Sequence, residues 1–265
     1  MIGFANESRL VMVTHAIWLS GIVLELVILV RCFSTRIFRN YPFFCVYLGC
    51  VFAGDVALPY LYKALSLNAY RTCYWAKEFV CVIAGYAVVM EIIERAFERY
   101  EGPKKLGRNA ALVVFAAVVG GTAFHAALDR FATSAYRSLD VEVGLRGAEL
   151  ILLAIVIVVI FYYGIPVGRN LKGITIGYGI CTAAVVMNEA VGSFAGRTFY
   201  AAFASIWSYS YLVSLVIWVA ALWSFEPNPA PEGWTQMDDD YQALANRTRL
   251  ALTVMRGHLR KAARP

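Results

Sequence analysis

The chain has 265 residues, of which 60% are apolar and only 16% are charged. An ordinary soluble domain is roughly 45–50% apolar, glycine included, and about 25% charged. One globular core of this size cannot hide so much apolar surface, so the composition argues against a soluble domain, a disordered chain or a disulfide-rich secreted module. It predicts a polytopic membrane protein.

Long apolar stretches divide the first 225 residues into predicted membrane spans. Each is close to the roughly 20 residues that a helix needs to cross a bilayer, and a helix satisfies its own backbone hydrogen bonds in lipid. The seven predicted spans cover about 10–31, 41–62, 70–95, 108–129, 141–163, 170–194 and 199–224. The predicted fold is therefore all-α, with residues 1–225 forming one bundle of seven transmembrane helices.

Lysine and arginine are distributed unevenly between the two ends of this predicted bundle. If the N-terminus is outside, about two-thirds of the 24 basic residues fall on the cytosolic side. That bias predicts an outside N-terminus and a cytosolic C-terminus. The net charge of +6 then faces anionic lipid, so it does not require a nucleic-acid partner.

The residues after the last span have a different character. Three prolines between positions 226 and 232 predict a stiff, extended linker over residues 226–237. Apolar and small side chains then recur every three or four residues, which predicts a cytosolic amphipathic helix over residues 238–262. This helix has three alternative placements: on the membrane surface, against the bundle or a partner, or paired with the same helix of a second copy.

Polar residues within the spans are the informative exceptions, because a charge at the bilayer centre costs about 2.5–3.5 kcal/mol on insertion scales. They concentrate in the outer third of the spans, which predicts an outward-facing polar chamber. The candidate chamber residues are His15, Asp55, Trp75, Glu78, His125, Arg146, Glu149, Asn188, Glu189, Ser208 and Tyr209. Glu25 is expected to be a deep charge of the inner half, and Lys77 to point away from Glu78 toward the interface.

Two interpretations of this chamber stay open. Carboxylates outnumber cations in it, which favours binding of a cation, a proton or an amine over an anion. Alternatively, Arg146 pairs with Glu149 and Asp55 in a network that serves only packing. Glu142, Arg146 and Glu149 follow i, i+4, i+7 spacing and share one helix face.

The sequence shows no signature of catalysis, a cofactor or a metal. The last span has no lysine for a retinal Schiff base, and the six cysteines form no zinc-binding pattern. His15 and His125 are too few for a metal hydrolase, and no nucleophile or phosphate-loop motif is present. We predict a protein that is not an enzyme.

Small residues four apart predict two faces of close helix contact, Gly173 with Gly177 and Ala117 with Gly121. Each face can pack within the bundle or against another subunit. Besides the lipid bilayer, a protein partner or a second copy is therefore expected at these faces or at the tail helix.

A set of short motifs resembles an uncharacterised group of bacterial seven-helix membrane proteins. The residues that carry the resemblance are Tyr41-Pro42-Phe43-Phe44, Tyr47-Leu48, Tyr74-Trp75, Glu78, Glu91-Ile92 and Tyr100. They span about 60 residues. The resemblance implies a multi-pass protein of the bacterial inner membrane, and it carries over no activity and no site.

These observations lead to three functional hypotheses. The first is a non-enzymatic sensor or binding protein whose outward-facing chamber receives a small ligand or ion, and which acts through a cytosolic or membrane partner. The second is a structural or accessory subunit of a larger membrane assembly. The third is a small cation or proton-coupled transporter.

Overall fold

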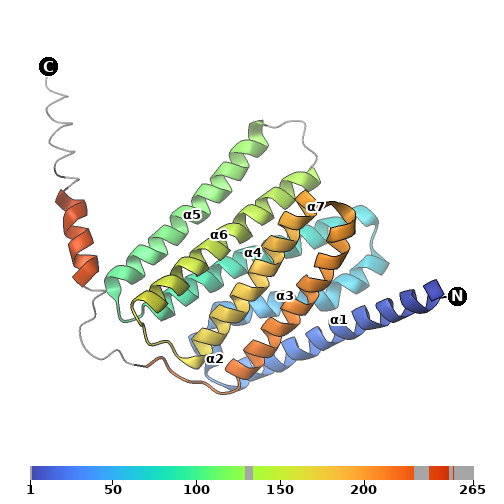
Figure 1. Ribbon diagram of the computed structural model, residues 1–265, viewed down its shortest axis with the longest axis horizontal. Helices are drawn as coiled ribbons and strands as arrows, with labels where there is room; N and C mark the ends of the chain where they lie inside the picture. Colours follow the sequence, from blue (N-terminus) through green and yellow to red (C-terminus); the bar gives the residue numbers. More distant parts are fainter. Residues whose placement is uncertain (1, 129–133, 230–238, 251–252, 254–265) are drawn as a thin grey trace.

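The computed structural model describes residues 2–128, 134–229, 239–250 and 253. These residues form helices and connections and contain no strand, which confirms the all-helical class. The helices are α1 (Ile2–Ser34), α2 (Ile37–Asn40), α3 (Pro42–Ala64), α4 (Leu67–Ala96), α5 (Glu101–Leu128), α6 (Ser134–Tyr162) and α7 (Arg169–Ala221). The long helices lie side by side in one bundle, and residues 239–250 add a short helix beside its end (Figure 1).

Helix α7 folds back on itself. A straight helix of its 53 residues would be roughly 80 Å long at 1.5 Å per residue. Instead, Asn170 Nδ2 near its start donates to the Ala221 carbonyl at its end, at 2.7 Å. Figure 1 shows the chain rising and returning. Residues 169–188 and 206–221 are therefore two antiparallel arms, called here the first and second arms, and they occupy the predicted sixth and seventh spans.

Glycines of the first arm make this close return possible. A Cβ on Gly173 would lie 2.0 Å from the Ala221 Cβ, and a Cβ on Gly177 would lie 2.4 Å from Trp218 Nε1. The glycine face that could have bound another subunit is thus occupied by the chain's own second arm. The other small-residue face remains open, because Ala117 is exposed and a Cβ on Gly121 would meet nothing within 4 Å.

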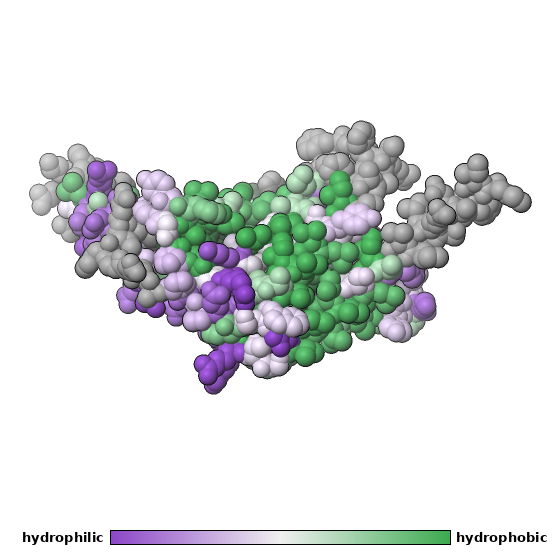
Figure 2. Space-filling model, turned by 60° about the horizontal axis from the view of Figure 1, so that its bottom comes forward, coloured by the Kyte–Doolittle hydropathy of each residue, from purple (hydrophilic) through white to green (hydrophobic). Residues whose placement is uncertain are grey.

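Length and composition mark four helical stretches of the described chain as long and apolar enough to cross a membrane. They are His15–Ser34, Pro42–Ala64, Glu142–Tyr162 and Arg169–Asn188, and Ile206–Ala221 is a shorter apolar helix. A broad apolar surface covers the middle of the molecule between more hydrophilic ends (Figure 2). These features indicate a multi-pass membrane protein, whereas seven crossings and an outside N-terminus remain predictions.

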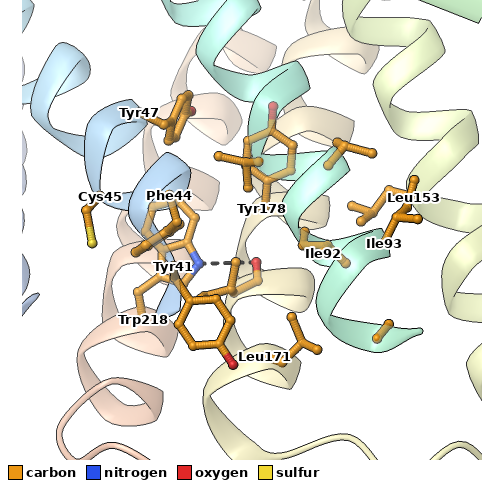
Figure 3. Close-up of a cluster of buried hydrophobic side chains, with 14 of the residues drawn as sticks. Tyr41, Phe44, Cys45, Tyr47, Ile92, Ile93, Leu153, Leu171, Tyr178 and Trp218 are labelled. Carbon is orange, nitrogen blue, oxygen red and sulfur yellow. Dashed lines mark hydrogen bonds between the residues drawn. The ribbon is translucent and has the colours of Figure 1, made fainter. Parts of the chain in front are cut away.

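Buried apolar side chains gather at one end of the bundle. This end, called here the α2 end, contains α2 and the connections at residues 97–100 and 163–168. Figure 3 shows its centre, where Phe44 meets Trp218 edge-on at 5.1 Å and Tyr47 meets Tyr178 at 5.4 Å. Packing of this kind fills the α2 end with interlocked rings.

A carboxylate of α4 fixes the start of α3 at this end. Pro42 occupies the first turn of α3, where a missing N–H does no harm. The next two amides, of Phe43 and Phe44, donate to the Glu91 carboxylate at 3.1 and 3.0 Å. Glu91 is 5% exposed and so supplies the cap that no local side chain provides.

The chain after α7 folds back under the α2 end. Asn228 accepts from the Gly168 amide at 3.0 Å and donates to the Arg95 carbonyl at 3.2 Å. The helix at residues 239–250 contacts the bundle at its first turn, where the Tyr163 hydroxyl donates to Asp240 at 3.1 Å. Its apolar residues Leu244 and Leu250 are exposed. Contact with the bundle and an open apolar face are both present in this helix, so its membrane placement stays a prediction.

Candidate functional site: a buried ionic network

Arg146 of α6 is the centre of a set of buried ion pairs. Its Nε donates to Glu142 one turn earlier at 2.8 Å, and its Nη2 donates to Glu78 of α4 at 2.9 Å. The three side chains are only 10–15% exposed. A guanidinium suits this position because its planar fork can hold two carboxylates at once.

Lys77 extends the ion pairs toward α3. Its Nζ donates to the second oxygen of Glu78 at 2.9 Å. The stem of Lys77 crosses Gly54 of α3, where a Cβ would lie 2.5 Å from Lys77 Cε. The sequence predicted that Lys77 points away from Glu78 toward the membrane interface, and this prediction is wrong. Because Gly54 has no side chain, the Lys77 stem can lie across α3 while its Nζ binds Glu78.

Glu25 of α1 and Asp55 of α3 form the next link. The Tyr211 hydroxyl of the second α7 arm donates to Glu25 Oε1 at 2.5 Å. The Glu25 and Asp55 carboxyl groups lie within hydrogen-bonding reach of each other, and Lys77 is near enough to act on both charges. Glu25 is fully buried, and its Oε2 has no hydrogen-bond partner among the described residues. The sequence assigned Glu25 to the inner half, apart from the chamber; the structure instead joins it to Asp55.

A last carboxylate pairs with a tyrosine on the other side of Arg146. Glu149 is fully buried and accepts from the Tyr178 hydroxyl of the first α7 arm at 2.7 Å. Gly85 of α4 makes the space for this contact, because a Cβ there would lie 2.1 Å from the hydroxyl oxygen and 3.3 Å from both Glu149 oxygens. Glu149 Oε1 has no hydrogen-bond partner among the described residues.

These contacts form three neighbouring clusters of polar groups, and the three together are called here the ionic network. It contains five carboxyl groups, two cations and two tyrosine hydroxyls. The members are Glu25, Asp55, Lys77, Glu78, Glu142, Arg146, Glu149, Tyr178 and Tyr211. They come from α1, α3, α4, α6 and both arms of α7, so the network links nearly every long helix of the bundle.

Four of the predicted chamber residues meet in this network: Asp55, Glu78, Arg146 and Glu149. Asn188 is buried elsewhere, and its Oδ1 has no partner among the described residues. The other described candidates lie outside the network: His15 and Tyr209 at the exposed surface, and Trp75 and Ser208 half-buried. The side chains of His125 and Glu189 lie outside what the structure describes.

Sequence reasoning did not assign Glu25, Lys77, Glu142, Tyr178 and Tyr211 to the site. Only Glu142 carried a usable signal, since its spacing places it on the same face as Arg146. The tyrosines look like ordinary interface or core aromatics until the packing of α7 is known.

Two features bound the network. On the α2 side, the network adjoins the interlocked rings of the core, which include its own Tyr178 packed against Tyr47 (Figure 3). On the surface of the molecule, a groove of about 330 Å³ lies between α3 and α4 and reaches Lys77. Its walls are mainly apolar and include Cys50, Ala57 and Leu61. The described residues contain no cluster of three or more groups suited to a metal ion.

Excess negative charge is the main chemical property of the site. With every group ionised, five carboxylates would face two cations in a region with little water. Uncompensated charge of this kind is costly inside a membrane protein, and protonation or binding of a cation would reduce that cost.

No protein-family model, curated protein or solved structure matches the chain.

Proposed function

We propose that the chain is a non-enzymatic seven-helix membrane protein that binds a proton or a small cation in the ionic network and acts as a sensor. The observation that carries this proposal is the excess of carboxyl groups over cations, together with buried carboxylate oxygens of Glu25 and Glu149 that have no hydrogen-bond partner within the described part of the chain. A network built only for packing would be expected to balance its charges, since each uncompensated buried charge is destabilising.

In the proposed arrangement the N-terminus is outside and the α2 end is cytosolic, as the distribution of lysine and arginine favours. The network then takes its ligand from the outer side. The packed core at the α2 end supports sensing over conduction, because large aromatic side chains such as Phe44 and Trp218 are closely packed there. A change in network charge would reach the α2 end through rigid helices rather than through a pore.

The sensor is proposed to act through a partner in the membrane. The exposed face of α5 with Ala117 and Gly121 supports this, because small residues facing lipid permit close approach of another helix. The same face supports the accessory-subunit alternative. The mass of the gently extracted protein tests both interpretations. A mass above that of one chain would support a bound partner, and the mass of a lone monomer would argue against one.

The test compares E78Q with E101Q in thermal unfolding of the detergent-solubilised protein. Glu101 is the matched control, since it forms only an exposed pair with Lys105 at 3.5 Å. A bound proton or cation stabilises the folded state in proportion to its occupancy. The wild type and E101Q should shift their midpoints together across a series of pH values and sodium, potassium, magnesium and methylammonium salts, and E78Q should lose much of that shift. Equal behaviour of E78Q and E101Q would contradict the proposal.

Proton or cation transport is the second candidate function, and the groove between α3 and α4 that reaches Lys77 is the observation in its favour. Reconstituted liposomes with a trapped pH or sodium indicator decide between the two. Flux that E78Q abolishes would replace the sensor proposal with a transporter.

A further inference from the structure

Glu25 and Asp55 interact inside the bundle, and among the described residues neither carboxyl forms an ion pair with a cation. Glu25 lies on α1, about ten residues from the α2 end of the helix, and Asp55 lies on α3. Their carboxyl groups are within hydrogen-bonding reach. Two ionised carboxylates have only acceptor oxygens, so a contact between them requires a donor that neither supplies.

The unsatisfied atom of Glu25 identifies where that donor is missing. Tyr211 satisfies Oε1, whereas the buried Oε2 has no hydrogen-bond partner among the described residues. One proton shared between the Asp55 and Glu25 carboxyl groups supplies a donor at this contact and removes one negative charge. Pairs of carboxyl groups that share a proton in this way are known in enzyme sites, where like charges so close cannot both ionise.

The groups that act on the pair directly lie on two other helices: Tyr211 on the second arm of α7, and Lys77 and Glu78 on α4. Tyr47 of α3 and Cys181 of the first α7 arm in turn act on Tyr211. Of these, Lys77 is the cation nearest to the pair, and in this structure its Nζ is bound to Glu78.

We propose that Glu25 and Asp55 form a proton-binding site in which the two carboxyl groups share one proton, and that Lys77 changes partner when the proton leaves. This inference rests on the proposed function, because it locates the binding event within the ionic network. When the proton passes to water, the pair gains one negative charge. The ammonium of Lys77 then moves from Glu78 toward Asp55, and Glu78 is left to Arg146 alone.

The geometry around Gly54 suits this exchange. The flexible stem of Lys77 lies against the glycine, on the same helix as Asp55 and one residue away from it. Rotation about the terminal torsions of this flexible side chain redirects the Nζ. The loss of the Lys77–Glu78 contact changes the charge around Arg146. Loss of the proton is thereby coupled to the ion pairs of α6.

The experiment is infrared difference spectroscopy of the full chain in lipid, which detects the carbonyl stretch of a protonated carboxyl group. Wild type, E25Q, D55N and the surface control E101Q are compared at neutral pH. The amide variants are suitable because a carboxamide N–H can replace the shared proton as donor, so the fold should persist. Wild type and E101Q should show one protonated buried carboxyl signal that is lost in both E25Q and D55N.

A signal that persists unchanged in both variants would overturn the shared proton. Absence of the signal from wild type, with a thermal midpoint that rises with sodium or potassium, would overturn it in favour of a cation held between the two carboxylates. A folded-state check by circular dichroism accompanies each variant, and D55E serves as a second variant if D55N does not fold. D55E should retain the signal at a shifted frequency, and its complete loss would contradict the proposal.

The test is separable from that of the proposed function. If E78Q loses its ligand-dependent stabilisation while the infrared signal survives in E25Q and D55N, only the shared-proton site fails. If E78Q also behaves like E101Q, the proposed function fails as well.

Discussion

The Arg146 guanidinium donates to Glu78 across 68 residues of sequence, and this contact ties α6 to α4. The same arginine donates to Glu142 on its own helix. One cation therefore pairs with two carboxylates. We expect the loss of Arg146 to lower the stability of the fold more than the loss of any other member of the network.

Replacement of Arg146 by methionine should destabilise the fold by about 3–5 kcal/mol, because it leaves the buried Glu142 carboxylate without a cation and Glu78 with Lys77 alone. Unfolding of the purified protein in mixed micelles with increasing denaturing detergent measures the change. R146K should lie between wild type and R146M, since an ammonium cannot form the same fork. A variant R146M as stable as wild type would show that the ion pairs do not hold α6 to α4.

Gly85 should be intolerant of a methyl group. G85A places a Cβ 2.1 Å from the Tyr178 hydroxyl oxygen, and overpacking of this kind costs about 1–3 kcal/mol. The control is Y178F, which removes the oxygen and so relieves the contact at the expense of the hydrogen bond to Glu149. A double-mutant cycle should show that G85A costs less in the Y178F background; equal costs in both backgrounds would rule out the clash.

Loss of the Glu91 carboxylate should loosen the start of α3. E91A leaves the buried amides of Phe43 and Phe44 without acceptors, at about 1–3 kcal/mol for each unsatisfied group. E91Q keeps one acceptor oxygen and should lose less. Hydrogen exchange of the first turn of α3 reports the effect directly, and unchanged protection in E91A would contradict the capping role.

The contact between Tyr163 and the tail helix should weaken in alkali. Burial, together with the hydrogen bond to Asp240 and its charge, raises the pKa of Tyr163 above that of free tyrosine. A raised pKa in the docked state means that the contact is fully formed below the free tyrosine pKa and is lost as pH rises through the docked value. Limited proteolysis after residue 229 should therefore accelerate at high pH, and Y163F should be cleaved faster at neutral pH with little further pH dependence. Equal cleavage of Y163F and wild type at neutral pH would argue against this contact.

The positions of the helices could be predicted from the sequence because lipid imposes a simple rule of length and apolarity. Within the described residues the seven predicted spans lie on helices except at a few end positions, such as 41, 163 and 222–224. Glu142 and Arg146 meet on the face that their spacing indicates. The fold of α7 differs in one respect, because the chain stays helical through residues 195–198, where a break was expected.

The partners within the site could not be predicted in the same way. Depth alone placed Glu25 away from Asp55, because counting residues from helix ends ignores the offset of α1 relative to α3 along the bundle. The inward course of Lys77 depends on a glycine of another helix, and the roles of Tyr178 and Tyr211 depend on the return of α7. Each of these is a tertiary contact that no local pattern contains.

The most direct test of the central claim is the number of protons and cations bound per molecule. Potentiometric titration of the folded protein in detergent, repeated in sodium, potassium, magnesium and methylammonium salts, would compare wild type with E25Q/D55N/E78Q and with E101Q. The account predicts that wild type and E101Q bind the same number of ions and that the triple variant binds fewer protons or cations within the range where all three are folded. Identical binding by all three proteins, at every pH and in every salt, would contradict it.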